Sequence, residues 1–437
     1  MTTVNRDILR LAVPTFGALV AEPLFLLADS AMVGHLGITP LAGLGIAGVV
    51  IQTIIGLMVF LAYATTPAVA RRLGAGDERG AVSVGIDGLW LALGLGALLG
   101  ISGWFATPLL VSPFGASPDV TEQASVYLSM SMAGLPAMLL VFAATGLLRG
   151  LQDTRTPLLV ATAGFAANIA LNFVLIYLLD LGIAGAALGT VLAQWGMAVA
   201  YLAVVVHHAR RTGASVRPHR AGISGSAFSG GWLFVRTVSL RVAILLASFV
   251  ATGLGTAELA GFQIVMTLFT FTAFALDALA IAAQALIGKS LGAADTTLVR
   301  SILARCVQWG VGSGLILGLV VIATSGIAGL LFTGDPDLAL LLMPSLVILG
   351  ISTPLAGFVF VLDGVLIGAG DARYLALTGI LNVAVFVPLA LWVLAAAPSD
   401  ATGLALLTAA FSIGYLAARA VTLGLRARTT AWMRTGA

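Results

Sequence analysis

Four carboxylates stand inside long apolar segments of the sequence, where an ionised group is energetically costly. They are Glu22, Asp29, Asp277 and Asp363. A charged side chain at the centre of a bilayer costs about 2.5–3.5 kcal/mol or more, so each is a candidate for binding a proton, a cation or a substrate. Glu22 and Asp29 are seven residues apart, and two helical turns place them on one face of a helix.

Asp29 is the leading candidate for a functional role, because the first half of the chain carries no Lys or Arg in the middle of an apolar segment. Asn168 and Asn172 stand at i and i+4 and therefore share a helix face, and Thr190 lies in the next apolar segment. We expect these four residues to form one polar site. The alternative is that the amides only hold helices together.

The second half differs, because it places basic residues near its carboxylates. Arg236 and Arg241 lie early in one apolar segment, and we expect Arg236 to extend toward the cytoplasmic surface. Arg241 lies about 8 Å deeper along the helix axis and needs an acidic partner, Asp277 or Asp363. Such an ion pair could simply fix helix packing. The residues that we assign to a substrate cavity or to secondary coupling are Glu22, Gln52, Arg241, Asp277 and Asp363.

The composition of the chain sets its class. Of 437 residues, 21 are Lys or Arg and 18 are Asp or Glu, so charged residues make up 9%, against about 25% in a soluble domain. The apolar fraction is 60% and the mean hydropathy is +1.09. These values exclude a soluble enzyme, a secreted scaffold and a disordered chain. Apolar runs of helix length predict an all-α integral membrane protein rather than a barrel.

Residues suited to enzyme or metal chemistry are scarce in the sequence. Cys306 is the single cysteine, so no intrachain disulfide can form, and the four histidines do not form a ligand cluster. No convincing pairing of a nucleophile with a base is apparent. We therefore expect no catalytic site, no metal site and no cofactor, apart from a transported proton or sodium ion.

Twelve segments are long and apolar enough to cross a membrane, which takes about 20 residues. Lys and Arg fall at both termini and in the loops after even-numbered segments, whereas the odd loops carry acidic residues and no Lys or Arg. By the positive-inside rule both termini are cytoplasmic, and we expect a multi-pass protein of the plasma (inner) membrane. The segments are roughly 8–34, 42–68, 83–106, 122–148, 157–179, 183–207, 228–252, 260–287, 301–324, 338–367, 374–396 and 401–424.

A shift of 218 residues aligns the two halves of the chain in five separate segments. We therefore expect two lobes, 1–210 and 227–437, joined by a cytoplasmic linker, 211–226. Six helices is an even number, so both lobes enter the membrane from the same side as a parallel repeat, with substrate bound at their interface. Pro136 and Pro354 are equivalent under the shift, and we expect each to break its helix and serve as a hinge.

Several motifs resemble those of MATE transporters, the multidrug and toxic compound extrusion family. Residues 22–37 read EPLFLLADSAMVGHLG, 73–77 read LGAGD and 149–153 read RGLQD. Residues 274–277, FALD, and 362–371, LDGVLIGAGD, resemble the DinF branch of that family. The resemblance covers essentially the whole chain. It implies twelve helices in two lobes and cation-coupled export of organic, often cationic, compounds by alternating access.

The resemblance also implies roles for residues, because in several members the acidic residue matching Asp29 couples transport to the ion gradient. Some members also carry an Asn followed four residues later by Asp, and a Thr in the sixth helix. Asn168 and Thr190 match this pattern, but the other position is Asn172. The lost negative charge weakens the case for sodium and leaves proton coupling through Asp29.

Two alternatives stay open: a sodium-coupled antiporter and a lipid-intermediate flippase of the same superfamily. The flippase is disfavoured because no Lys or Arg lies in the outer halves of the helices. We expect a monomer that contacts membrane lipid and a small organic, cationic or amphipathic substrate, with no nucleic-acid partner.

Overall fold

The computed structural model describes residues 3–332, 336–396 and 398–436; within these ranges, the side chains of Glu22, 328–332 and 336 lie outside the description. The described residues form helices and turns without a β-strand. They divide into two compact units, Gly17–Gly230 and Met1–Phe16 with Gly231–Gly436. The division falls inside two helices, α1 (Thr3–Gly34) and α9 (Arg220–Leu254), which each contribute to both units, and the expected linker, 211–226, stays a prediction.

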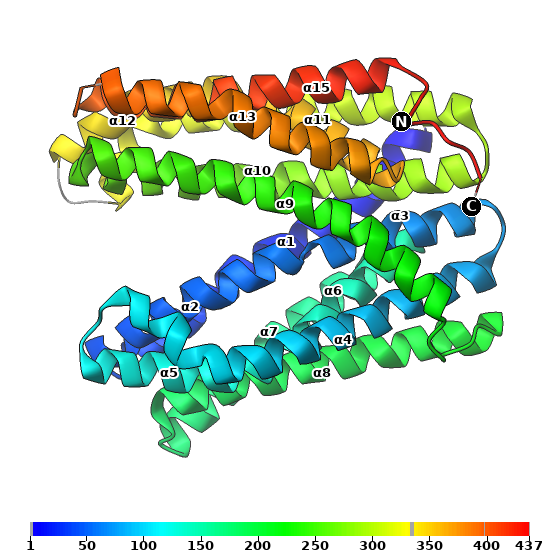
Figure 1. The fold of residues 1–437 in the computed structure, drawn as a ribbon, viewed down its shortest axis with the longest axis horizontal. Helices are drawn as coiled ribbons and strands as arrows, with labels where there is room; N and C mark the ends of the chain where they lie inside the picture. The colour runs from blue at the N-terminus through cyan, green and yellow to red at the C-terminus, as the bar shows by residue number, and fades with distance from the viewer. Residues whose placement is uncertain (1–2, 333–335, 397, 437) are drawn as a thin grey trace. The chain divides into compact units, whose positions relative to one another are not determined.

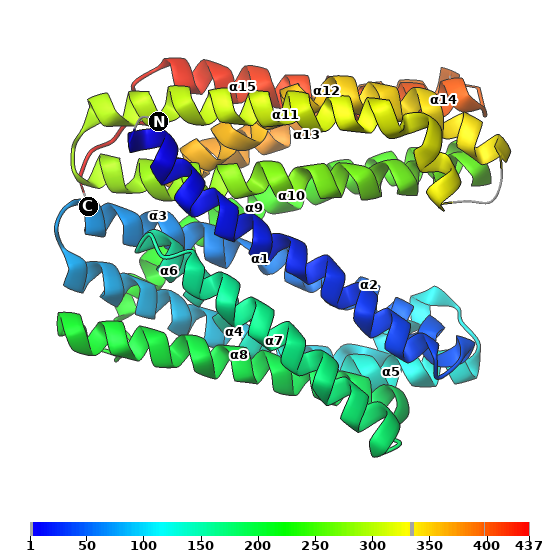
Figure 2. The ribbon, with the colours of Figure 1, turned by 180° about the vertical axis from the view of Figure 1, so that it is seen from behind.

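The unit Gly17–Gly230 packs around an apolar core in which small residues such as Ala47 and Ala124 are fully buried. Helices α7 and α8 run side by side in it (Figure 2). Its elements are most of α1 (Thr3–Gly34), α2 (Ile38–Met58), α3 (Phe60–Gly74), α4 (Glu78–Val111), η1 (Ser112–Phe114), α5 (Pro118–Met132), α6 (Leu135–Gly150), α7 (Arg155–Phe173), the π-helix η2 (Val174–Leu178) and α8 (Gly182–Thr212).

The second unit has its own core, in which the rings of Phe386, Phe411 and Tyr415 contact one another, with Phe411 and Tyr415 stacked and Phe386 set edge-on or tilted against them. Helix α12 packs against α10, α11 and α15 (Figure 1). Its elements are the start of α1, most of α9 (Arg220–Leu254), α10 (Thr256–Gly292), α11 (Thr296–Phe332), α12 (Pro336–Gly368), α13 (Ala372–Ala396), α14 (Ala401–Ala409), the π-helix η3 (Ala410–Tyr415) and α15 (Leu416–Arg428).

The expected all-α membrane fold is confirmed. Eleven helical stretches in the described residues are long and apolar enough to cross a membrane, and the bent pair α5–α6 makes a twelfth. Glycine-rich, apolar sequences suit this architecture, because small residues let helix backbones approach closely.

The internal repeat is visible in the packing as well as in the sequence. A Cβ atom on Gly96 would lie 2.5 Å from Pro136 Cα, and one on Gly314 would lie 2.8 Å from Pro354 Cα. Glycine is therefore required at both positions. The 218-residue shift relates the two glycines to each other and the two prolines to each other. Further contacts with this offset are Gly146 on Ala62 with Gly364 on Ala280, and Gly150 on Thr66 with Gly368 on Gln284.

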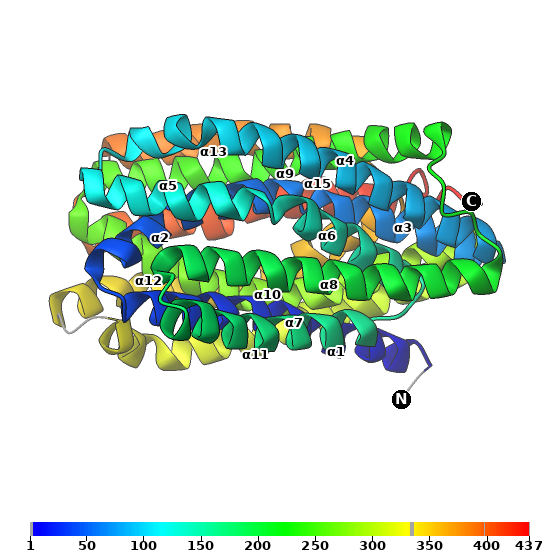
Figure 3. The same ribbon diagram turned by 90° about the horizontal axis from the view of Figure 1, so that it is seen from below.

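The two prolines nevertheless act differently. In the first half the helix is interrupted before Pro136, and α5 and α6 meet at 50° (Figure 3). In the second half α12 runs through Pro354 as one helix without the expected break, and the hinge role of Pro354 stays a prediction. The neighbouring residue explains the difference, because the helix-destabilising Gly134 stands where the second half has Ser352.

The repeated GD, QD and AD dipeptides form turns at helix ends. In each turn a residue with positive φ precedes an aspartate: Gly76 before Asp77, Gln152 before Asp153, Ala294 before Asp295 and Gly370 before Asp371. Three of these aspartates accept a hydrogen bond from the backbone N–H three residues later, which caps the next helix. These motif residues therefore shape turns and do not belong to the buried polar sites.

Candidate ion-coupling site

Asp29 lies near the end of α1 and is buried in the unit Gly17–Gly230, with 4% of its surface exposed. The amide Nδ2 of Asn172, on α7, donates a 2.7 Å hydrogen bond to Asp29 Oδ1. The hydroxyl of Tyr127, on α5, donates a 3.2 Å hydrogen bond to Asp29 Oδ2. Within the described part of the chain the carboxylate has no ion pair, so only neutral donors compensate its burial.

The contacts continue beyond Asp29 into a closed ring. Asn172 Nδ2 also donates to Asn168 Oδ1 at 3.1 Å, and Asn168 Nδ2 donates to Thr190 Oγ1 at 3.1 Å. The Thr190 hydroxyl in turn interacts with the Tyr127 hydroxyl. The structure thus brings together all four predicted coupling residues, with Tyr127 as a fifth member. We call these five side chains the Asp29 ring.

Asp29 is the acceptor of both hydrogen bonds that reach it, one from the Asn172 amide and one from the Tyr127 hydroxyl. Asn172 Oδ1 has no hydrogen-bond partner among the described residues; it lies against Gly189 of α8, where any Cβ atom would overlap it. The π-helix η2 begins two residues after Asn172, and its Tyr177 hydroxyl donates a 2.7 Å hydrogen bond to the Met32 carbonyl of α1. Single π-turns of this kind are frequent at functional sites.

Two other predicted residues do not join the ring. The side chain of Glu22 lies outside the described residues. Gln52 is half-buried on α2 and makes no hydrogen bond with the described part of the chain. Tyr127 was missed by sequence reasoning, although a signal exists, because a tyrosine in an apolar segment needs a partner for its hydroxyl when buried.

The second half of the chain fills the equivalent positions differently. A shift of 218 residues carries Asp29 to Ala247, Asn168 to Phe386 and Asn172 to Ala390, and these three residues are completely buried in the apolar core of their unit. The helix packing therefore does not require polar groups at these positions. Asp29, Asn168 and Asn172 are therefore additions to the shared fold, whereas Thr190 corresponds to Thr408 and Tyr127 to Ser345.

A second buried polar cluster occupies the other unit, centred on Asp363 of α12. Arg236 of α9 forms an ion pair with Asp363 Oδ2, and Arg419 of α15 lies 3.4 Å from Oδ1. Asp277 of α10 also interacts electrostatically with Arg419. Arg419 was missed by sequence reasoning, although it stands in an apolar segment. Under the 218-residue shift the Asp363–Arg419 pair corresponds to a neutral hydrogen bond, Thr145 to Tyr201 at 3.3 Å.

These contacts correct the predicted roles of the two arginines on α9. Arg236 does not extend to the surface but is the partner of Asp363, with 12% of its side chain exposed. Arg241 pairs with neither Asp277 nor Asp363; it is exposed and makes no hydrogen bond or ion pair with any described residue. The reason is rotational phase, since five residues along a helix turn the side chain by about 140°.

Arg241 is nevertheless deep along its helix. It stands thirteen residues before Leu254, the end of α9, which corresponds to about 20 Å along the axis. An arginine facing hydrocarbon at that depth is very costly, so such residues normally face a water-filled path. Leu245 and Phe249 share its exposed face.

A metal site is not supported in the part of the chain that the structure describes, which contains no group of three or more His, Cys, Asp or Glu side chains able to hold a metal ion. The chemistry open to the Asp29 ring is therefore the binding and release of a proton, or of an ion held by its few oxygen atoms.

Comparison with known proteins agrees with this architecture. A family model described as MatE matches residues 14–174 and 236–392. The DNA damage-inducible protein F of Escherichia coli is 30% identical over 391 residues, covering 85% of this chain and 82% of that protein. The protein DETOXIFICATION 44, chloroplastic, of Arabidopsis thaliana is 30% identical over 387 residues, covering 85% and 74%.

Solved structures show the same fold. A MOP superfamily transporter from Pyrococcus furiosus superposes with a TM-score of 0.88 at 24% identity, covering 99% of this chain and 97% of the other. The Vibrio cholerae MATE transporter VcmN gives a TM-score of 0.88 at 22% identity, covering 99% of both chains. With its multi-pass helical fold, its internal repeat and the match of the family model over most of its length, the chain belongs to the MatE family of secondary transporters.

Proposed function

We propose that the chain is a proton-coupled antiporter that exports small organic compounds, with Asp29 as the residue that carries the proton. One observation carries the proposal: neutral donors converge on a buried, unpaired carboxylate at positions that the other half of the repeat fills with Ala247, Phe386 and Ala390. A polar group that the fold does not need, and that is costly to bury, is kept for function.

The direction of the hydrogen bonds suggests how a proton would act. The observed geometry suits an ionised Asp29, which accepts hydrogen bonds from Tyr127 and Asn172. Protonated Asp29 must donate one hydrogen bond, so one arm of the ring has to reverse. If the Asn172 amide turned, its unpaired Oδ1 would meet Asp29, and its donor to Asn168 would be lost. Proton binding would thereby weaken the hydrogen bonds that hold α1 to α5 and α7, and would allow α1 to move.

The same geometry favours a proton over sodium. A hard cation such as sodium prefers oxygen ligands, but the ring presents the Nδ2 of Asn172, and not its Oδ1, to Asp29. Asn172 also supplies no second negative charge. A sodium ion would therefore need the amide to turn before it could bind.

The substrate is proposed to be an organic, cationic or amphipathic compound that crosses the plasma membrane outward, with both termini of the protein in the cytoplasm. An exposed guanidinium within the membrane, Arg241, is the candidate contact for an acidic or hydrogen-bond-accepting group of an amphipathic substrate. Asp277, which is half-buried, and the exposed Leu245 and Phe249 would offer charge and apolar contact area.

The test is efflux from liposomes that contain the purified protein, driven by a proton gradient or by a sodium gradient at constant pH. We expect proton-driven efflux of a fluorescent organic compound, and we expect Asp29→Asn to abolish it while the variant stays folded. Asp119→Asn, the same change at an exposed position on α5, is the matched control. Normal proton-driven efflux by Asp29→Asn, or full efflux driven by sodium alone, would contradict the proposal.

A further inference from the structure

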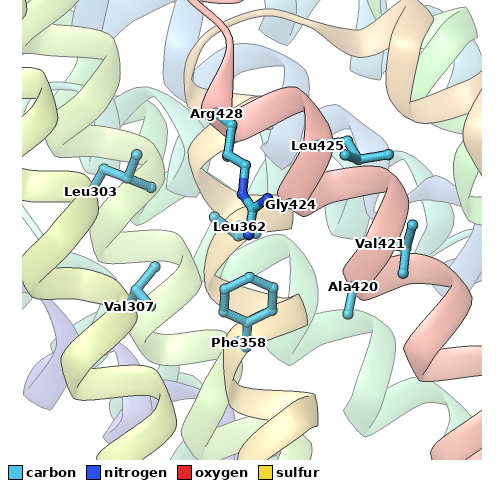
Figure 4. A pocket seen from close by; sticks show the side chains of 10 residues that line it. Leu303, Val307, Phe358, Leu362, Ala420, Val421, Gly424, Leu425 and Arg428 are labelled. Atoms are coloured by element: carbon cyan, nitrogen blue, oxygen red, sulfur yellow. The ribbon is translucent and has the colours of Figure 1, made fainter.

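A cavity of about 500 Å³ lies between α11, α12 and α15, within one unit and apart from the Asp29 ring. Its size falls in the range of small-molecule sites, about 300–1,000 Å³. Apart from Arg428 its walls are apolar. Figure 4 shows the lining side chains, which include Val307 of α11, Phe358 and Leu362 of α12, and Val421 and Leu425 of α15.

Arg428 is the single charged residue that lines this cavity, and its side chain points in an unusual direction. Arg428 is the last residue of α15, and its side chain runs back from the helix end toward Leu362 and Phe358 (Figure 4). An arginine at the end of a spanning helix ordinarily extends outward to water. Arg428 makes no ion pair or hydrogen bond with the described residues, so its charge is available to a ligand.

Arg426, a neighbouring arginine in the same helical turn, has partners for its guanidinium within the chain. Arg426 Nε donates a 2.7 Å hydrogen bond to Asp371 Oδ2, and its guanidinium lies 4.7 Å from the centre of the Tyr374 ring. The protein therefore supplies a carboxylate and an aromatic face to one arginine and neither to the other. The difference indicates that the partner of Arg428 comes from outside the chain.

The opening of the cavity points to the source of that partner. Val421 and Leu425, at its edge, are each 58% exposed, and exposed apolar side chains on a spanning helix suit contact with hydrocarbon. Gly424 lies between them and leaves room; a Cβ atom there would already lie 3.6 Å from Phe358 Cζ. A ligand with a long apolar part and an anionic end matches both the walls and Arg428.

We propose that this cavity binds one anionic phospholipid, with an acyl chain along Val307, Phe358 and Leu362 and the headgroup phosphate on Arg428. The sequence predicts that α15 ends on the cytoplasmic side, where anionic lipids attract basic residues and where basic pockets between helices bind lipid headgroups. The lipid would bridge α11, α12 and α15, and it would support α15 close to the turn in which Arg426 is fixed to Asp371.

The test uses the purified full chain and native mass spectrometry with phosphatidylglycerol or phosphatidylethanolamine of the same acyl chains. We expect one more tightly held phosphatidylglycerol than phosphatidylethanolamine. Arg428→Gln should weaken this binding about five-fold, the contribution of one basic residue near a membrane surface. Gly424→Leu, which fills the cavity without changing charge, should also remove the lipid. Arg434→Gln, the same charge change outside the cavity lining, should behave as wild type.

Several results would overturn the proposal. Equal retention of the two lipids would remove the role of the anionic headgroup, and unchanged phosphatidylglycerol binding by Arg428→Gln or by Gly424→Leu would remove the site. Displacement of the lipid by inorganic phosphate alone would show that the acyl chain contributes nothing. Thermal unfolding of each variant identifies loss of fold, and either variant alone is sufficient for the test.

Discussion

Asn172 on α7 donates a 2.7 Å hydrogen bond to Asp29 on α1 while its own carbonyl oxygen stays without a partner in the described residues. The amide nitrogen of Asn172 is therefore engaged as a donor while its oxygen is not engaged as an acceptor. This oxygen is the acceptor that a protonated Asp29 would need. Asn172 is itself neutral, so giving it a charge is an informative experiment.

Asn172→Asp should widen the range of ions that drive transport. A second carboxylate beside Asp29 creates a pair of like charges, which cannot both ionise easily and therefore hold a shared proton to higher pH. The added anionic oxygen also gives a hard cation a better site. We expect proton-driven efflux to persist at higher pH and a new response to a sodium gradient, both measured in liposomes. An unchanged pH profile without any sodium response would contradict this prediction.

Gly189→Ala should damage the site without touching an ionisable residue. The new methyl group would overlap Asn172 Oδ1 and push the amide away from Asp29. Because a hydrogen bond to a charged group contributes about 1.5–3 kcal/mol, we expect at least about a ten-fold loss of proton-driven efflux. Gly196→Ala on the same helix has open space around the added methyl group and is the control. Equal activity of the two variants would refute the packing argument.

Arg241→Gln should change substrate selection and leave stability intact, since Arg241 has no ion pair or hydrogen bond among the described residues. We expect weaker export of zwitterionic compounds such as ciprofloxacin and equal or better export of a permanent cation such as tetraphenylphosphonium. Arg241→Lys keeps the charge and should be intermediate. Loss of both activities with a lowered unfolding temperature would mean that the residue has a structural role.

Asp363→Asn should destabilise the protein strongly, because it leaves Arg236 and Arg419 buried without their shared carboxylate. Breaking a buried ion pair from one side costs about 3–5 kcal/mol. The exposed pair Arg72–Asp77, whose side chains are 42% and 46% exposed, provides the comparison, and Arg72→Gln should cost about 1 kcal/mol or less. Thermal unfolding in detergent measures both, and similar melting temperatures would exclude this structural role for Asp363.

Sequence patterns predicted the features that depend on distance along the chain. Apolar length fixed the spans, the 218-residue offset identified the repeat, and the i, i+4 spacing of Asn168 and Asn172 placed both on one side of α7. The structure brings these amides to Asp29 because the repeated helix contacts, such as Gly96 on Pro136, determine where the helices lie.

Features that depend on rotation about a helix axis were not predicted. Arg241 was predicted as an ion-pair partner only because of its depth along α9. In the structure it is Arg236, on the inward face of α9, that pairs with Asp363. Tyr127 was missed for a related reason, because a single side chain shows no periodicity that would reveal which face it lies on. The break before Pro136 and its absence at Pro354 depended on one neighbouring residue, Gly134 or Ser352.

The assignment of α1 and α9 to both compact units has a consequence for biogenesis. A chain cut in the polar segment 211–226 would give two fragments of six spans each, yet each fragment would carry the start of a helix that belongs to the other fragment's unit. We therefore expect that neither half folds by itself. During synthesis the first half would then complete its folding only after the second half has been made. Co-expression of the separate halves should therefore yield protease-resistant protein, whereas either half alone should not.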